Sequence, residues 1–121
     1  MKIAICSEQN ESESLASQRF GRAPWIGVYD DVSEQWEFVS NTQNLNAVQG
    51  AGIQTAQNIL NSQADVVLTC NAGPKAMRVL QAAKVAVYQL TNQQSVSDCI
   101  DLYKSNKLSV MEEANVEGHW I

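Results

Sequence analysis

Apolar residues gather in short runs along the chain, and each run has the length of a β-strand. The runs at 2–6, 66–69 and 85–90 are almost continuously apolar, which is typical of strands covered on both faces. The runs at 25–31 and 36–41 are rich in aromatic and β-branched residues, and only a short polar link separates them. We therefore expect central parallel strands and one antiparallel hairpin.

Other segments carry the spacing of helices. Apolar residues at 53, 56, 59 and 60 share one face of a helix over 53–60. The segment 74–83 predicts a helix with Pro74 in its first turn, where a missing N–H costs nothing. A third helix is expected after Ser95, which has the form of an N-cap with Asp98 in the first turn. Its apolar positions form a core stripe at helical spacing: Val96, Cys99, Ile100 and Tyr103.

The alternation of helices with apolar strands predicts an α/β fold, with a largely parallel sheet between helices and one antiparallel member from the hairpin. Right-handed crossovers place the first strand next to the fourth. Cys6 and Cys70 are then expected at the carboxyl ends of neighbouring central strands. We predict a single domain over residues 1–107 and a loosely ordered tail over 108–121, because the tail has no strong hydrophobic period.

Composition narrows the class of protein. The 121 residues include 45% hydrophobic and 17% charged residues, as in an ordinary globular domain. The net charge of −5 opposes non-specific binding to nucleic acid or to an anionic membrane. The start MKIAIC has neither the length nor the pattern of a signal peptide, so we expect a cytoplasmic protein. Its three cysteines show no CxxC spacing, which disfavours a disulfide framework or a zinc finger.

Glycines and cations concentrate in segments that are expected near the carboxyl ends of the strands, where open α/β sheets bind ligands. These segments are SQRFGRAP at 17–24, QGAG at 49–52 and CNAGPK at 70–75. Together with the helix start at Pro74 they predict an anion-binding site. The plainer alternatives stay open: each glycine can serve a turn, and the cations can form a solvated helix face. The residues concerned are Arg19, Gly21, Arg22, Gly50, Gly52, Gly73, Lys75 and Arg78.

Cys70 has three possible roles. As a nucleophile it lacks an obvious base, because no His or acidic residue lies close to it in sequence. As a ligand of a soft metal it needs no base, and Cys6 and His119 could supply further bonds. As a small residue in the core it would need no function at all. The sequence leaves the second and third roles open.

The motifs SQRFGRAP at 17–24, QGAGIQTAQ at 49–57 and GPKAMRVLQAA at 73–83, in this order after an MKIAI start, resemble the dinitrogenase iron-molybdenum cofactor biosynthesis family. That family includes nitrogenase accessory proteins that carry cofactor precursors, and small orange proteins that hold a mixed molybdenum and copper sulfide cluster. The likeness extends to about Lys107. It implies a three-layer ribonuclease H-like fold, with a mixed five-stranded sheet, one antiparallel strand and helices on both faces.

The resemblance also implies a non-enzymatic protein that binds an iron-sulfur or molybdenum-containing sulfide cluster, and possible partners that assemble or receive the cluster. The predicted cofactor-binding residues are Arg19, Gly21, Arg22, Gly50, Gly52, Asn71, Gly73, Pro74 and Lys75, and the candidate metal ligands are Cys70, Cys6 and His119. Cys6 and Cys70 depart from the family pattern, which often has proline or a small residue at the first position and glycine at the second.

Other functions are weighed against cluster binding. A regulatory or protein-interaction module with a vestigial pocket is the main alternative, and a thiol-dependent enzyme is the weaker one. A metal-dependent nuclease is disfavoured, because that chemistry needs carboxylates to hold its ions and the first strand, KIAIC, has none.

Overall fold

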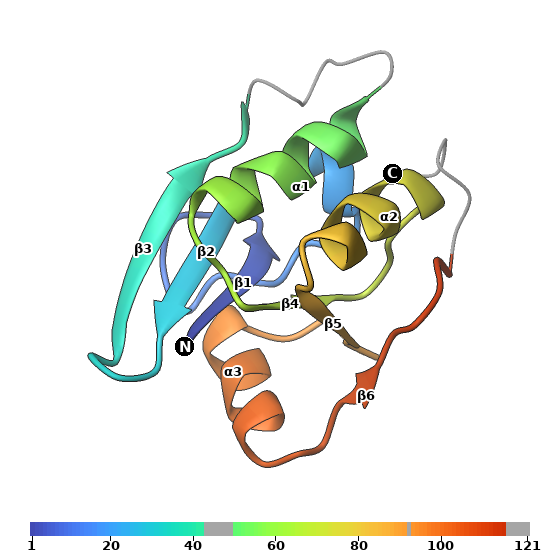
Figure 1. Ribbon diagram of the computed structural model, residues 1–121. Coiled ribbons are helices and arrows are strands. Elements are labelled where there is room, and N and C mark those ends of the chain that lie inside the picture. The colour runs from blue at the N-terminus through green and yellow to red at the C-terminus, as the bar shows by residue number, and fades with distance from the viewer. Residues whose placement is uncertain (43–49, 92, 116–121) are drawn as a thin grey trace.

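The computed structural model describes residues 1–42, 50–91 and 93–115. Six strands of these residues form one mixed sheet. Its elements are β1 (Lys2–Ser7), the 3-10 helix η1 (Phe20–Arg22), β2 (Trp25–Asp30), β3 (Gln35–Ser40), α1 (Ala51–Asn61), β4 (Val66–Thr69), α2 (Pro74–Ala82), β5 (Ala86–Gln89), α3 (Val96–Lys104) and β6 (Ser109–Val110) (Figure 1).

The strand order is β3-β2-β1-β4-β5-β6. β1 pairs in parallel with β4, as the crossover rule predicts, and β2 and β3 form the predicted antiparallel hairpin. The prediction of five strands with one antiparallel member is wrong. β6 pairs antiparallel with β5, so both β2 and β6 run against β1. A strand of two residues is too short to show the alternation from which strands are predicted.

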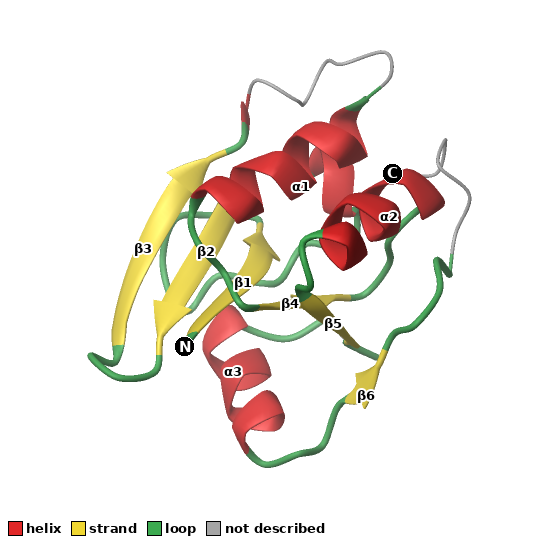
Figure 2. Ribbon diagram, viewed as in Figure 1, coloured by secondary structure: helices red, strands yellow, loops and turns green. Residues whose placement is uncertain are grey.

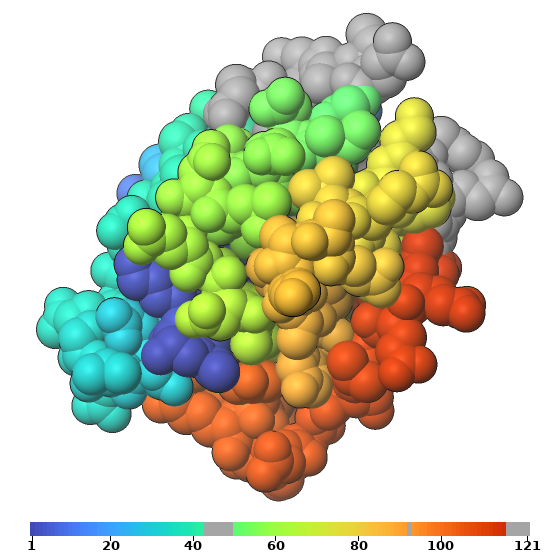
Figure 3. Space-filling model, viewed as in Figure 1, coloured from blue at the N-terminus to red at the C-terminus, as the bar shows by residue number. Residues whose placement is uncertain are grey.

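Helices cover both faces of the sheet, which gives three layers (Figure 2). α1 and α2 lie side by side on one face and form a continuous surface in the space-filling view (Figure 3). α3 covers the other face. Alternate residues of β1 point to the two layers: Ala4 and Cys6 pack with α1 and α2, whereas Ile3 and Ile5 pack with α3.

The helices begin and end close to where their patterns predict. α2 covers the predicted segment with Pro74 at its start, and α1 extends the predicted helix by a few residues. At α3 the Ser95 side chain accepts a hydrogen bond from the Asp98 N–H at 3.1 Å, which is the predicted cap.

Residues 109–115 contact the sheet and the start of α2. The Met111 side chain is buried, and its N–H donates to the Val87 carbonyl at 2.7 Å. The division of the chain at Lys107 stays a prediction, and residues 116–121 of the predicted tail lie outside the described residues.

Candidate functional site

The segments that were predicted to carry the site meet at one end of the molecule. We call residues 17–24, 50–52 and 70–75 together the mouth. β1 and β4 end at the mouth, and α1 and α2 both begin there (Figure 1). Cys6 and Cys70 lie near these two strand ends, as predicted from the topology.

The first two segments touch through their glycines. A Cβ atom on Gly21 would lie 2.9 Å from the Gly52 nitrogen and 3.2 Å from the Ala51 carbonyl carbon. Real Cβ atoms do not approach backbone atoms so closely, so only glycine fits between η1 and the first turn of α1. Gly21 therefore has a packing role against the start of α1, whereas the sequence pattern predicted a turn or a ligand contact for it.

The first and third segments are joined by Asn71. The side-chain amide of Asn71 donates to the Gln18 carbonyl at 2.9 Å. The backbone carbonyl of Asn71 accepts a hydrogen bond from the Thr69 hydroxyl, also at 2.9 Å. Because these bonds tie the segment after β4 to the loop before η1, the three segments form one connected group.

The two helices at the mouth begin after a glycine rather than after a capping side chain. Gly50 precedes α1 in the left-handed region at φ 80°, a conformation that favours glycine. Gly73 precedes α2, and Pro74 occupies its first turn. Neither helix has a side-chain cap or an acidic residue in its first turn. Their first N–H groups and the positive end of each helix dipole therefore meet no acidic side chain of the same turn.

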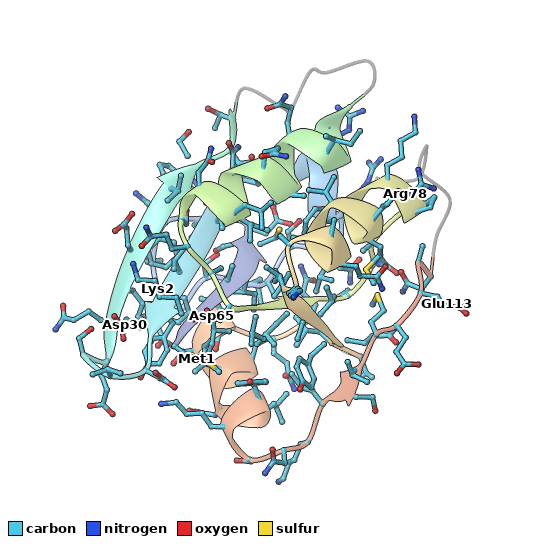
Figure 4. All side chains as sticks on the ribbon, viewed as in Figure 1. Met1, Lys2, Asp30, Asp65, Arg78 and Glu113 are labelled. Carbon is cyan, nitrogen blue, oxygen red and sulfur yellow. The ribbon has the colours of Figure 1, made fainter. Side chains whose placement is uncertain are left out.

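Cations flank these helix starts. Arg19 is exposed just before η1, Arg22 is half-buried at the end of η1, and Lys75 is exposed in the first turn of α2. Arg78 lies exposed one turn further along α2 (Figure 4). Four of the eight Lys and Arg residues thus lie in or beside the mouth of a protein with a net charge of −5. A local site for an anion is consistent with this distribution.

Cys6 lies behind the mouth rather than at its surface. Its side chain is 1% exposed, and the thiol contacts the Phe20 carbonyl at 3.7 Å. Burial raises the pKa of this thiol to about 12, so it is protonated at neutral pH. A metal ion would have to displace the proton and reach a position inside the layer of α1 and α2.

Cys70 is more accessible than Cys6. It is half-buried and packs against the layer of α3, and burial raises its pKa. Since Cys6 packs on the opposite face, the two thiols do not point into one layer. The assignment of Cys6 and Cys70 as metal ligands stays a prediction. His119 lies outside the described residues. Within the described ranges, no group of three His, Cys, Asp or Glu residues could hold a metal ion.

Sequence patterns did not predict the two asparagines that hold the mouth together. Asn41 is fully buried, and its side chain donates to the Ala23 carbonyl and to the Thr55 hydroxyl, both at 2.9 Å. It thereby fastens the end of the first segment to α1. Asn115 hydrogen-bonds the third segment at several points. Neither residue lies in a motif, and an isolated asparagine has no spacing from which such a role could be predicted.

The opposite end of the sheet has a different character. A cavity of about 220 Å³ lies there, and its lining includes Lys2, Asp30 and Trp36. Nearby, the N-terminal ammonium pairs with Asp31 at 2.7 Å, and the Lys2 N–H donates to Asp65 at 2.9 Å. Figure 4 places Met1, Lys2, Asp30 and Asp65 together, far from Arg78. These contacts fasten the start of β1 and do not extend to the mouth.

The sequence as a whole matches a known family. A family model described as dinitrogenase iron-molybdenum cofactor matches residues 1–106. The chain belongs to this family. The resemblance predicted from the three motifs is thereby confirmed, and the family match includes all three segments of the mouth. Among the described residues, no helix combines the length and the apolar character needed to cross a bilayer.

A relative by sequence and two solved structures match this chain over most of their own length. An uncharacterized protein of Methanocaldococcus jannaschii is 30% identical over 115 residues, which cover 93% of this chain and 92% of that protein. The apo form of the orange protein from Desulfovibrio gigas is 32% identical with a TM-score of 0.91, covering 95% of this chain and 96% of its own. A Thermotoga protein provisionally assigned as NifB, of the DUF35 family, is 29% identical with a TM-score of 0.83, covering 97% and 98%.

Proposed function

We propose that this protein binds an anionic metal-sulfur cluster or cofactor precursor at the mouth and carries it without turning it over. The family match supports a role connected with the iron-molybdenum cofactor, and the likeness to the orange protein supports cofactor binding or carriage. The cargo is an iron-sulfur cluster or a molybdenum-containing sulfide. Proteins that assemble or receive the cluster would be its partners.

The observation that carries this proposal is the pair of helix starts at the mouth. α1 and α2 begin side by side, with neither a capping side chain nor an acidic residue in the first turn. An anion placed there would accept hydrogen bonds from N–H groups of the first turns and gain from both helix dipoles. Arg19, Arg22 and Lys75 would add formal positive charge to that field.

The available donors suit a carrier better than a permanent holder. Cys70 is the half-buried thiol of the mouth, and Cys6 is enclosed in the core. At most one or two thiolate bonds would then supplement electrostatic binding, with Cys70 as the first candidate. A cluster held in this way can be released when a partner supplies stronger ligands, because few metal-sulfur bonds have to break.

The finer assignments of the fold and of the activity belong to the same proposal. A ribonuclease H-like class is supported by the strand order β3-β2-β1-β4-β5 with β2 reversed and by helices on both faces. A carrier without catalysis is supported by the family match and by the likeness to the orange protein. It is also consistent with the buried state of Cys6 and Cys99, whose thiols are protonated at neutral pH.

The proposal is tested by anaerobic reconstitution. The protein is mixed with tetrathiomolybdate, or with iron and sulfide, and passed through a desalting column before its visible spectrum and metal content are measured. We expect a retained chromophore in the wild type. Protein that leaves the column colourless and free of metal would refute cluster binding.

Variants separate the two contributions to binding. Arg19→Ala and Lys75→Ala should each weaken tetrathiomolybdate binding by about fivefold at low salt, because each removes one charge at the surface. Lys107→Ala removes an exposed cation away from the mouth and serves as the matched control. Cys70→Ala should shift the absorption spectrum if the thiolate bonds the metal. An unchanged spectrum would remove Cys70 as a ligand and leave the electrostatic site.

A further inference from the structure

Asn115 uses both ends of its side-chain amide to hold the third segment of the mouth. Its NH₂ group donates to the Cys70 carbonyl at 2.9 Å and to the Asn71 side-chain oxygen at 3.1 Å. Its carbonyl oxygen accepts the Ala72 N–H at 2.8 Å. In addition, its backbone N–H donates to the Ala72 carbonyl at 3.2 Å. One residue, 43 positions away in sequence, thus satisfies both backbone polar groups of Ala72.

The bonds to Ala72 matter because this residue has no access to water. Ala72 is 0% exposed. A buried N–H or carbonyl without a partner is costly, so the segment would have to rearrange if Asn115 did not supply these bonds. Gly73 and Pro74 follow directly, and they set the direction in which α2 begins. The backbone at Ala72 therefore controls where the first N–H groups of α2 point.

The same asparagine acts on the link between the segments. Asn71 accepts a hydrogen bond from Asn115 while it donates to the Gln18 carbonyl in the first segment. Fixing the orientation of the Asn71 amide thus also fixes the loop that leads to Arg19. Asn115 thus contacts the third segment directly and is linked to the first segment through Asn71, without contributing a charge of its own.

Asn115 is held in place by the chain that precedes it. β6 pairs with β5, and the buried Met111 follows it. The Gln81 side chain of α2 donates to the Glu112 carbonyl at 2.7 Å. The segment thereby runs from the sheet edge along α2 toward the start of that helix (Figure 1). These contacts fix the position of Asn115 relative to α2 itself.

We infer that Asn115 is a positioning residue of the cluster-binding site. It holds the backbone of residues 70–73 in the conformation that presents the start of α2 to an anion, and it couples the C-terminal segment to the mouth. The inference rests on the proposed function for its consequence on binding, whereas its consequence for the segment 70–73 can be measured without any ligand.

The test compares Asn115→Ala with the wild type. The Asn115 side chain is exposed, so its removal leaves no cavity. We expect amide hydrogen exchange at Ala72 to become about tenfold faster or more, while amides of α3 keep their protection. We expect the dissociation constant for tetrathiomolybdate to rise about fivefold, as for the loss of a hydrogen bond that orients the site. Asn61→Ala, at an exposed asparagine that ends α1, is the matched control and should change neither quantity.

Two further measurements distinguish positioning from charge and from general destabilisation. Asn115→Ala changes no charge, so the slope of tetrathiomolybdate affinity against salt should equal that of the wild type, whereas Lys75→Ala should flatten it. Asn115→Asp keeps an acceptor for the Ala72 N–H, so exchange at Ala72 should stay slower than in Asn115→Ala. Asn115→Asp should nevertheless bind tetrathiomolybdate more weakly than the wild type, because its carboxylate repels this dianion.

The possible outcomes separate this inference from the proposed function. Unchanged exchange at Ala72, or unchanged affinity with faster exchange, would overturn the role of Asn115 as a positioning residue. A wild type that binds no tetrathiomolybdate, iron or sulfide would overturn the carrier function and, with it, the claim about binding. Faster exchange at Ala72 in that case would still establish that Asn115 holds the segment.

Discussion

The two faces of the sheet carry helices that begin in opposite ways. α3 starts with Ser95 as a side-chain cap and Asp98 in its first turn, and both stabilise a helix N-terminus. α1 and α2 start after Gly50 and Gly73, with no side-chain cap and no acidic residue in the first turn. Both faces are otherwise built alike, with apolar side chains packed between helix and strand.

The difference in helix starts bears on the proposed anion site. A capped helix start satisfies its own N–H groups, so an anion gains little there. A glycine at the helix start gives up only a few tenths of a kcal/mol relative to a capping side chain, and it places no side-chain oxygen on the first N–H groups. The cations Arg19, Arg22 and Lys75 lie around the uncapped starts, whereas Asp98 lies at the capped one. The following predictions test this comparison, starting with the largest expected effect.

The two faces should respond equally to high pH, because each buries a thiol. Burial raises the pKa of Cys6, under α1 and α2, and of Cys99, on α3, from 9.0 to about 12. Above pH 9 the unfolded chain loses these protons while the folded protein keeps them. The free energy of unfolding should therefore fall as pH rises from 9 toward 12, by up to about 1.4 kcal/mol per pH unit for each thiol.

The measurement is urea denaturation at a series of pH values for the wild type, Cys6→Ala and Cys99→Ala. Each variant should show a shallower fall, since one thiol no longer contributes. If the free energy of unfolding of Cys6→Ala falls with pH as steeply as that of the wild type, the Cys6 thiol is accessible to water. The two faces would then differ in their cores as well.

Gly21→Ala should damage the face of α1 directly. The new Cβ would lie 2.9 Å from the Gly52 nitrogen, and backbone atoms cannot yield as a flexible side chain can. We expect a loss of about 2 kcal/mol in the free energy of unfolding. Gly50→Ala is the matched control, because no atom of the described residues, apart from the chain neighbours, lies within 4 Å of its Cβ position, and the strain at φ 80° costs about 1 kcal/mol. Equal stability of Gly21→Ala and the wild type would show that η1 and α1 do not pack as described.

Ser95→Ala removes the cap that distinguishes α3. We expect a loss of about 1 kcal/mol in the free energy of unfolding, measured by urea denaturation. Ser105→Ala, at the exposed residue that follows α3, should have almost no effect. Tetrathiomolybdate binding should stay the same in both variants, and weaker binding in Ser95→Ala would mean that the two faces are coupled.

Exchanging the charges of the two helix starts gives the smallest change in stability and the sharpest comparison. Lys75→Glu places an acid in the first turn of α2 and should stabilise the protein by about 0.5 kcal/mol, whereas Asp98→Lys should destabilise it by a similar amount. Binding of tetrathiomolybdate should fall about tenfold or more in Lys75→Glu and stay unchanged in Asp98→Lys. Calorimetry measures both quantities, and a binding loss in Asp98→Lys alone would place the anion on the α3 face.

Much of the fold followed from local patterns. The apolar run at 66–69 and the helix beginning at Pro74 lie where the sequence predicts them, because burial on both faces and the position of proline leave strong local signals. The pairing of β1 with β4 followed from the handedness of crossovers. β6 was missed, since two residues cannot display a period.

The candidate site was predictable as a location but not as a geometry. The sequence predicts Gly21, Gly52 and Gly73 as site residues because their segments are expected near strand ends. The close contact between Gly21 and Gly52 depends on how η1 approaches α1, which no pattern predicts. Cys6 and Cys70 were expected together, and both lie near the predicted strand ends. Their side chains pack on opposite faces, because residues alternate along each strand and the register between β1 and β4 decides the pairing.

The sequence alone predicts five of the six strands and the three α-helices of the described residues, the pairing of β1 with β4, the acidic balance of the chain and the family to which it belongs. These depend on residue type, spacing and motif, which are properties of the chain alone. Three features are visible only in the tertiary structure: Asn41 and Asn115 hold the mouth together, Cys6 is enclosed, and two uncapped helices begin side by side. The physical reason is that hydrogen bonds and burial between distant segments depend on three-dimensional approach, and no local pattern in the chain encodes the distance at which two segments meet.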